Sequence, residues 1–462
     1  MTVQTNRLVY LFAFIILLVY FFVYAVSPLV DHDPAIYTII GRAFILDGIA
    51  PYGYVFDHKP IAIYYIYGLL SLIYPFKTGF FAFSSMAFII GIAVFINRKT
   101  LKFGDLILSC LAICACTAFS YQLSGNTELF SAAFIILSIG SMTNYSKKDA
   151  FLSGIFCCIA FNINYLSSIC LLLPTLHYFF KLLKKSRWEN ILIYSAGFAA
   201  CFLLLLLPVV VLGGTSALVE YVAMQYTFIA NYGKYSMPLY SSAIYFMGMV
   251  SSFIPVMYAS LRSNLSLKSF IPYLLCLPGC YLAAISSGYK YQHYFTFFAV
   301  IMSLFVIHLM KENGIKATIL LAFPVLFMSI NDTINRAPLM ISRFVDFNIK
   351  GIDSRFDELS SIVGDKKVLP IRSSHLPFYF SSINPSINLV WDNHSKIMYG
   401  RNESNFFISE IKKKPEFIIT KHNMCTSDKS LASVCKEINE RYKIRYMLTW
   451  AYPFDLYEMK KP

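Results

Sequence analysis

The chain has 462 residues, of which 57% are hydrophobic and only 14% are charged, and its formal net charge is +14. Long apolar runs recur along its first three quarters, which excludes an ordinary soluble globular protein and predicts a mainly α, polytopic membrane protein. Nucleic-acid binding does not account for the positive charge, because no basic stripe with interleaved aromatic residues lies in a soluble segment.

The first apolar run, Leu8 to Val26, is long enough to cross a bilayer as one uncleaved helix. Ten further runs give a prediction of about eleven transmembrane helices. They cover about residues 79–97, 104–121, 128–143, 150–163, 165–181, 191–213, 239–260, 269–286, 294–310 and 316–334. Two alternatives stay open: residues 150–181 could form one long kinked helix, and Pro60 to Tyr74 could be a further span. We treat Pro60 to Tyr74 as a helix lying in the outer interface.

Basic residues in the short connecting loops set the predicted orientation. Fourteen of them lie on the side of the N-terminus, and five lie on the other side when the C-terminal tail is excluded. We therefore expect a cytoplasmic N-terminus, with the loop after the first span facing outward.

That outward loop, Asp31 to Pro60, is polar and carries paired carboxylates. Asp33 and the proline after it have the form of an N-cap followed by a proline at the first helical position, which predicts a helix from Pro34 to Leu46. Tyr37 and Arg42 lie on this helix. A carboxylate at the membrane surface can also act as a general base on a hydroxyl, so Asp33 is open to both interpretations.

The same loop ends in Asp57, His58 and Lys59, directly before the aromatic helix that starts at Pro60. A lysine near a helix start is electrostatically unfavourable unless it meets an anion. A lipid phosphate at the interface would be such an anion. The alternative is a lysine that reaches nonspecifically to lipid headgroups.

Two further outward positions carry charge near the membrane surface. Glu128 opens a span, where it is either a group of the site or a cap on the helix dipole. Lys290 and His293 bracket the start of a later span. A phosphate partner would explain Lys290, whereas a lone histidine is more often an interfacial polar residue. The placement of all these residues on one face is stronger evidence than any of them alone.

Hydrophobicity falls near residues 331–336, which predicts a membrane domain over residues 1–335 and a small soluble α/β domain over residues 336–462. Strands are expected at Lys367–Ile371, Ile387–Trp391, Glu416–Thr420, Lys443–Thr449 and Asp455–Met459, and helices at Glu403–Lys413 and Asp428–Arg441. Within the membrane domain, juxtamembrane helices are expected over about residues 33–75 and 213–238; the latter segment is amphipathic and rich in tyrosine.

Nine of the eleven cysteines lie in apolar spans, where they are expected to be small buried hydrophobic residues. Cys425 and Cys435 lie in the outward-facing tail. An oxidising compartment favours a disulfide between them, and the alternative is a pair of reduced cysteines that are near in sequence only.

The order of these residues resembles the integral-membrane, polyprenyl-phosphate-sugar-dependent glycosyltransferases of the GT-C fold, in particular the protein mannosyltransferase and aminoarabinose transferase branch. The resemblance rests on Asp33, Tyr37, Gly48, Pro51-Tyr52, Lys59-Pro60, Glu128 and Lys290 through Tyr294. It implies that Asp33 is the base or the group that orients the acceptor, and that Lys59 contacts the lipid-linked phosphate.

Three departures from the family pattern leave the donor sugar and the roles of the acids open. Pro34 stands where many members carry a second acid, so Asp31 or Asp57 would have to supply that charge. His58 occupies a position that is often acidic in relatives. Residues 162–165 lack a lysine that some relatives carry between the fifth and sixth spans.

The function that the resemblance implies is transfer of a sugar from a polyprenyl-phosphate carrier on the outer face of a bacterial inner membrane, with a periplasmic C-terminal domain. Asp33 would deprotonate an acceptor hydroxyl in an inverting displacement, with Lys59, Arg42 and Lys290 stabilising the departing phosphate. Glu128 would orient the acceptor or hold Arg42.

The expected partners are the lipid-linked donor, membrane lipid and a glycan, lipid or protein acceptor, with lipopolysaccharide or O-antigen favoured. No cofactor is certain, and a divalent metal stays open. The rival functions are a transporter or flippase of lipid-linked sugars and an O-antigen polymerase.

Overall fold

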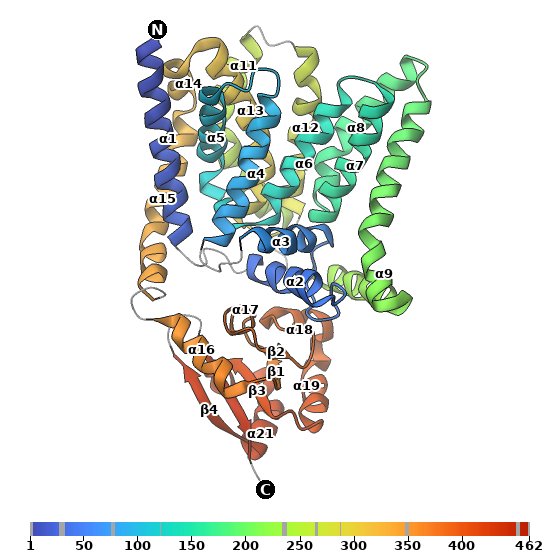
Figure 1. Cartoon of the computed structure of the whole chain (residues 1–462), viewed down its shortest axis with the longest axis vertical. Coiled ribbons are helices and arrows are strands. Elements are labelled where there is room, and N and C mark those ends of the chain that lie inside the picture. The colour runs from blue at the N-terminus through green and yellow to red at the C-terminus, as the bar shows by residue number, and fades with distance from the viewer. Residues whose placement is uncertain are drawn as a thin grey trace.

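The computed structural model describes residues 3–26, 33–74, 79–120, 122–232, 238–263, 267–286, 288–346, 351–449 and 453–460. These residues form a bundle of helices and a small sheet domain, which lies at the end of the bundle opposite the N-terminus (Figure 1). Two short helices lie across that end, between the bundle and the sheet domain.

The bundle follows the apolar runs of the sequence, because each predicted run coincides with one helix or one bent pair of helices. Its helices are α1 (Val3–Val26), α4 (Phe80–Ile96), α5 (Phe103–Thr117), α6 (Thr127–Met142), α7 (Lys147–Ile163), α8 (Ser167–Lys184), α9 (Glu189–Tyr232), α10 (Leu239–Ser252), α11 (Ile254–Arg262), α12 (Leu267–Ser286), α13 (Thr296–Asn313), α14 (Ile315–Leu321) and α15 (Phe323–Phe344). Because α7 and α8 are separate helices, the alternative of one kinked helix over residues 150–181 is wrong.

Among the described residues, four helices are long and apolar enough to cross a membrane, or up to six if the bent pairs α10–α11 and α14–α15 each form one span. Several further apolar helices are shorter. The count of about eleven spans therefore stays a prediction.

Burial within the bundle separates a core from a periphery. α13 is buried along most of its length and packs against α5, α6, α11 and α12. On α9, by contrast, Leu203 and Leu204 are 68% and 67% exposed. Large apolar side chains on the outside of a helical bundle suit contact with lipid rather than with water.

The two helices across the end of the bundle are α2 (Asp33–Asp47) and α3 (Ala62–Ile73) (Figure 1). The prediction of a helix from Pro34 to Leu46 is confirmed. The two helices approach closely where Gly41 faces Gly68: a Cβ atom added to Gly68 would lie 2.5 Å from the Gly41 carbonyl oxygen. Side chains larger than hydrogen therefore do not fit at this crossing.

The long helix α9 changes direction at Gly214, which has a φ of 72°. This left-handed conformation favours glycine. The part of α9 that follows, up to Tyr232, turns across the end of the bundle (Figure 1). It is the predicted juxtamembrane helix over residues 213–238, of which residues 233–237 lie outside the described part of the chain.

The C-terminal domain contains a five-stranded sheet in the order β2-β1-β3-β5-β4. β1 pairs in parallel with β2 and β3, and β5 pairs antiparallel with β3 and β4. Its elements are α16 (Ile352–Val363), β1 (Lys367–Ile371), α17 (Leu376–Ser381), β2 (Asn384–Pro385), α18 (Asp392–Tyr399), α19 (Glu403–Lys412), β3 (Phe417–Lys421), α20 (Met424–Ser427), α21 (Ala432–Arg441), β4 (Tyr442–Leu448) and β5 (Phe454–Met459). The predicted boundary between residues 335 and 336 lies inside α15, and α16 begins at Ile352.

The predicted strand from Ile387 to Trp391 is wrong, since this segment is a loop. Leu389 and Val390 are buried in a core that continues into α2 and α3, so packing between the two parts of the chain accounts for the apolar run. The carbonyl oxygen of Asn388 accepts a hydrogen bond from the backbone N–H of Phe56 at 2.8 Å, rather than pairing within the sheet.

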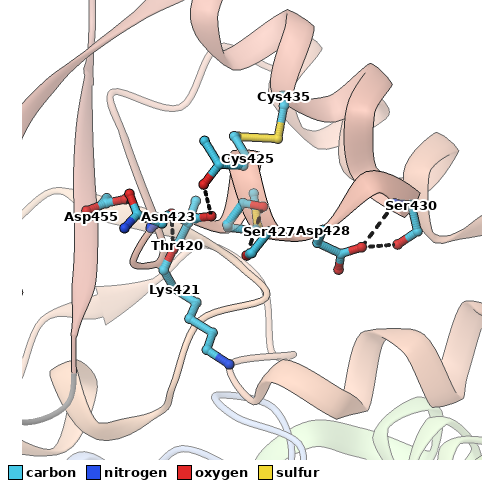
Figure 2. The surroundings of a disulfide bond; sticks show 11 residues. Thr420, Lys421, Asn423, Cys425, Ser427, Asp428, Ser430, Cys435 and Asp455 are labelled. Carbon is cyan, nitrogen blue, oxygen red and sulfur yellow. Dashed lines mark hydrogen bonds between the residues drawn. A yellow bond between two sulfur atoms is a disulfide. The ribbon is translucent and has the colours of Figure 1, made fainter.

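A disulfide joins Cys425 of α20 to Cys435 of α21 (Figure 2). The bond links a short helical turn after β3 to the helix before β4. The other nine cysteines are free, and eight of them are buried.

Candidate functional site

The structure brings three predicted residues together from elements that are distant in sequence. Asp33 starts α2, Lys59 lies in the loop before α3, and Glu128 lies in the first turn of α6. Lys59 and Glu128 are buried, Asp33 is partly buried, and Lys59 interacts electrostatically with both acids. The site therefore contains a buried cation that interacts with two carboxylates.

The charge of Lys59 is preserved in this setting. Burial alone would lower the pKa of Lys59, but the carboxylates of Glu128 and Asp33 outweigh burial and raise it above its ordinary value. The side chain is thus a permanent cation at neutral pH, which is the form that attracts a phosphate.

The backbone around Lys59 is held by side chains because it lies outside any helix or strand. The carbonyl oxygen of Lys59 accepts hydrogen bonds from the Tyr52 hydroxyl at 2.7 Å and the Tyr64 hydroxyl at 2.9 Å. Gln225 of α9 donates from Nε2 to the carbonyl oxygen of Asp57 at 3.0 Å. Buried carbonyl groups need such donors, so this loop is fixed from three directions.

The turn between α7 and α8 supports Glu128. Asn164 Nδ2 donates to Glu128 Oε1 at 2.9 Å, and Asn164 Oδ1 accepts from the backbone N–H of Leu166 at 3.0 Å. Tyr165 of the same turn interacts electrostatically with Lys59. Neither Asn164 nor Tyr165 was predicted as a site residue. The sequence feature that could have identified them is a short polar turn between two apolar runs, on the predicted outer side of the membrane.

Tyrosines complete the surroundings of the two acids. The Tyr37 hydroxyl donates to Asp33 Oδ2 at 3.5 Å, as its position one helical turn after Asp33 permits. Tyr294 interacts electrostatically with both Glu128 and Asp33 and hydrogen-bonds with Tyr232 at the end of α9. Tyr294 and Tyr232 are therefore further candidates for the site; neither was predicted as a site residue, although Tyr294 ends the segment from Lys290 on which the family resemblance rests.

Four other predicted residues have different surroundings. The Arg42 guanidinium carbon is 5.9 Å from the centre of the Phe80 ring, and Arg42 interacts electrostatically with Tyr379 of α17. Lys290 is exposed on the loop that leads to Tyr294. His293 is buried and its ring stacks on Tyr291, and Asp31 lies outside the described residues.

Asp57 and His58 lie close to a residue of the C-terminal domain. Asp57 Oδ1 lies 3.0 Å from His58 Nδ1 and 3.8 Å from Nε2 of His394, which belongs to α18. One ligand atom from each residue can be chosen such that all three lie within 4.8 Å of one another, so this group could hold a metal ion. His394 was not predicted.

The protonation states of this group follow from burial. Burial lowers the pKa of His394 to about 3 and also lowers the pKa of His58, so both imidazoles are neutral at pH 7. Burial opposes the ionisation of Asp57, but at the low pH at which this carboxyl titrates the two imidazoles are protonated, and with the Lys59 cation they hold the pKa of Asp57 below its usual range.

A helical bundle whose first loop forms two helices across its end, followed by a small α/β domain at that end, is an arrangement of the GT-C fold. The solved structures it resembles include ArnT, the aminoarabinose transferase, from Cupriavidus metallidurans. The structure of ArnT bound to undecaprenyl phosphate has a TM-score of 0.64 at 9% identity, with 98% of each chain covered. The apo structure has a TM-score of 0.60 at 10% identity, covering 99% of this chain and 98% of that chain.

No family model and no curated protein sequence matches this chain. At an identity near 10%, the likeness to ArnT shows a shared fold. The predicted fold class, a polytopic GT-C-type helical protein with a small C-terminal sheet domain, is confirmed.

Proposed function

We propose that this chain is a membrane glycosyltransferase that takes its sugar from a polyprenyl-phosphate carrier. The observation that carries the proposal is Lys59, a buried cation that interacts with Asp33 and Glu128 at the end of a bundle with the GT-C fold. Further support comes from ArnT, which shares this fold and has been solved with undecaprenyl phosphate bound.

The chemistry of such a donor explains why the site lies at the end of the bundle. Moving a long hydrocarbon chain out of the bilayer costs about 0.8 kcal/mol per CH₂ group, so the enzyme must act at the interface. The phosphate then reaches Lys59, which stabilises the negative charge that grows on it as the bond to the sugar breaks.

Asp33 is the proposed base. An acceptor hydroxyl oxygen attacks the anomeric carbon, the bond between that carbon and the phosphate oxygen breaks, and the hydroxyl proton moves to Asp33. The polyprenyl phosphate leaves as an anion, and the anomeric configuration inverts. Tyr37 orients the Asp33 carboxylate, while Glu128 positions Lys59 and the acceptor.

Arg42 and Lys290 are proposed as further phosphate-binding cations at the edge of the site. Arg42 lies at the contact of α2 with Phe80 and Tyr379, and Lys290 is exposed on the loop before Tyr294. Arg42 lies on α2, which begins with Asp33. The loop that carries Lys290 leads to Tyr294, which interacts with both Asp33 and Glu128.

The proposed location is a bacterial inner membrane, with the site and the C-terminal domain in the periplasm. The excess of basic residues in the loops at the other end supports this orientation. The disulfide between Cys425 and Cys435 fits an oxidising compartment. A lipopolysaccharide or O-antigen acceptor is the one we favour.

Donor binding tests the proposal first. With the full chain in lipid nanodiscs and undecaprenyl phosphate as the probe, Lys59→Ala should weaken binding at least tenfold. Asp33→Asn should leave binding within about twofold of the unmodified protein. Lys148→Ala, an exposed lysine at the start of α7, is the matched control and should bind normally. Equal binding by Lys59→Ala and the control would contradict the assignment of Lys59.

Transfer is tested with polyprenyl-phosphate sugars and a mixture of hydroxyl acceptors, by measuring released polyprenyl phosphate. Asp33→Asn should reduce release by at least 100-fold while the protein remains folded. Movement of the labelled lipid across the bilayer without cleavage would favour a transporter. Elongation of a lipid-linked glycan without use of a polyprenyl-phosphate monosaccharide would favour a polymerase.

A further inference from the structure

A polar pocket with a volume of about 520 Å³ lies at one edge of the C-terminal domain. Three segments form its wall: the start of β1, the residue after β2, and the end of α19 with its connection to β3. Four lysines and two glutamates line it, namely Lys366, Lys367, Lys413, Lys414, Glu410 and Glu416. We call it the lysine pocket. Its volume falls within the range of about 300–1,000 Å³ that is typical of small-molecule sites.

The lysine pocket lies at the edge of the sheet that faces away from the membrane bundle. Lys367 is the first residue of β1, and Glu416 directly precedes β3, which is parallel to β1. After the other end of β1 comes α17, which packs against α2 (Figure 1). The carboxyl ends of these strands therefore lie toward the juxtamembrane helices, and their starts lie on the opposite side. This places the pocket apart from the site around Lys59.

Two of the four lysines are neutralised within the pocket. Lys366 forms an ion pair with Glu416. Lys413 Nζ lies 2.7 Å from Glu410 Oε1 and 2.9 Å from Glu410 Oε2. Both glutamates are thus engaged, each with one ammonium group.

The other two lysines have no acidic partner. Neither Lys367 nor Lys414 forms an ion pair with an acid of the described residues. Four lysines and two glutamates leave the pocket with an excess of two positive charges. Like charges held close together repel each other, and a concave wall concentrates their field. An anion in the pocket would relieve this repulsion.

The helix dipole of α19 offsets only part of the charge. The C-terminus of a helix is equivalent to about −0.5 elementary charge. The pocket has two positive charges in excess, and Lys412 in the last turn of α19 adds another beside it. Stabilisation of a helix end therefore does not explain the whole group of lysines.

Lys414 occupies a backbone position that usually favours glycine. Its φ is 56°, and its N–H donates to the carbonyl oxygen of Ile411 at 2.9 Å, so this residue closes the C-terminus of α19. Helices often end with a residue in this left-handed conformation, which glycine and asparagine adopt most easily. A lysine holds the position against a conformational cost, and what it adds to the pocket is an ammonium group.

The mixed composition of the wall favours a saccharide over a simple anion. Ammonium groups bind phosphate, whereas carboxylates such as Glu410 and Glu416 accept hydrogen bonds from hydroxyl groups. The hydroxyl of Ser386, which also lines the pocket, can donate and accept. A ligand with a phosphate beside several hydroxyl groups meets both kinds of partner.

We propose that the lysine pocket binds a phosphorylated sugar unit of a glycan, with Lys367 and Lys414 on the phosphate and Glu410 and Glu416 on the sugar hydroxyl groups. Binding at this site does not depend on sugar transfer. The identification of the glycan as the acceptor rests on the proposed function. In that role the pocket is a second contact, which holds a long acceptor on the enzyme while another part of it reaches the site around Lys59.

Equilibrium dialysis of the full chain in nanodiscs tests the proposal. The radiolabelled probes are glucose 6-phosphate, glucose and inorganic phosphate. Glucose 6-phosphate should bind more tightly than either of the other two, because it alone meets both the ammonium groups and the carboxylates. Equal affinity for glucose 6-phosphate and inorganic phosphate would overturn the assignment to a saccharide.

Lys414→Asn is the central variant, because asparagine adopts the left-handed conformation but carries no charge. It should keep its melting temperature and bind glucose 6-phosphate about fivefold more weakly, as expected for an exposed ionic contact. Lys367→Gln, also at an exposed position, should show the same loss. Lys436→Gln is the matched control: Lys436 is an exposed lysine of α21 that does not line the pocket, and this variant should bind like the unmodified protein.

Unchanged binding of glucose 6-phosphate in Lys414→Asn and Lys367→Gln would overturn the proposal. Tighter binding of an acidic peptide, hexaglutamate, than of glucose 6-phosphate would also overturn it, in favour of a protein partner. Donor binding by Lys59 is measured separately with undecaprenyl phosphate, so either proposal can fail without the other.

Discussion

Asn164 Nδ2 donates a hydrogen bond to Glu128 Oε1 at 2.9 Å and so joins the turn between α7 and α8 to the first turn of α6. Both residues are buried, and the same asparagine also lies 3.0 Å from Thr127 Oγ1. The acid that accompanies Lys59 is therefore oriented by a neutral side chain from another helical hairpin.

Asn164→Ala should reduce sugar transfer and stability together. A hydrogen bond to a charged group contributes about 1.5–3 kcal/mol, and Glu128 would lose its oriented donor. Transfer rate and melting temperature in nanodiscs measure the two effects. Asn190→Ala is the control: Asn190 Nδ2 donates to the Tyr145 carbonyl oxygen at 2.9 Å, at the start of α9. This variant should lose stability but keep its transfer rate once folded. Equal transfer rates in both variants would contradict a role for Asn164 in the site.

The crossing of α2 and α3 should not tolerate a methyl group. In Gly41→Ala the new Cβ would lie 2.6 Å from the backbone nitrogen of Gly68, closer than real contacts allow, so the helices must move apart. Overpacking of this kind costs about 1–3 kcal/mol. Because Tyr64 of α3 holds the loop at Lys59, donor binding should weaken as well. Melting temperature and undecaprenyl phosphate binding are the measurements. Gly91→Ala on α4, where a Cβ meets no atom within 4 Å, should be harmless; a similar loss in that variant would contradict this explanation.

The C-terminal domain contains a buried ion pair whose loss should be costly. Arg372 donates from Nε and Nη2 to the two carboxylate oxygens of Glu403, each at 2.6 Å, and Ser395 donates to the same carboxylate. Removing one partner of a buried pair costs about 3–5 kcal/mol. Glu403→Ala should approach the lower end of this range, because two other acids lie within 3.8 Å of Arg372.

Calorimetry of the full chain in detergent would follow the unfolding of the domain in Glu403→Ala. The control is Glu440→Ala, since Glu440 belongs to an exposed pair with Lys436 at 4.0 Å. Exposed pairs contribute about 0–1 kcal/mol. If the unfolding temperature fell no further in Glu403→Ala than in Glu440→Ala, the ion pair between Arg372 and Glu403 would contribute little to stability.

Loss of the disulfide should destabilise the same domain. The bonded cysteines are ten residues apart in sequence, and closing a loop of that size in the unfolded chain contributes about 3 kcal/mol at most. The double variant Cys425→Ser/Cys435→Ser should melt at a lower temperature than the oxidised protein. A reducing agent should lower the melting temperature of the unmodified protein to that of the double variant, and should leave the double variant unchanged. If a reducing agent also lowered the melting temperature of the double variant, the loss of stability would have to come from the other cysteines.

The helices could be predicted because burial in a membrane or a bundle selects long apolar runs, and each run became a helix or a bent pair. The same signal failed at Ile387 to Trp391, where the apolar residues are buried between two parts of the chain and form no strand. Among the described helices, α16, α17 and α18 were not predicted. They are short, and their buried apolar residues pack into a core that is formed largely by other segments of the chain.

Charged residues of the site could be predicted because charge on an outward loop of an apolar chain needs a partner. Asp33, Lys59 and Glu128 were found in this way. Asn164, Gln225 and His394 could not be found, because their importance depends on contacts with residues 36, 168 and more than 300 positions away. A single sequence gives no measure of such distances.

The three donors that hold the backbone at Lys59 have a consequence for how a ligand is bound. Tyr52, Tyr64 and Gln225 fix this segment before any ligand is present. Binding therefore does not have to restrict a mobile loop, and the conformational entropy cost has already been met during folding. An anion that reaches Lys59 meets a segment that is already ordered, so the rate of the first encounter should depend on lateral diffusion of lipid to the end of the bundle and not on closure of a loop.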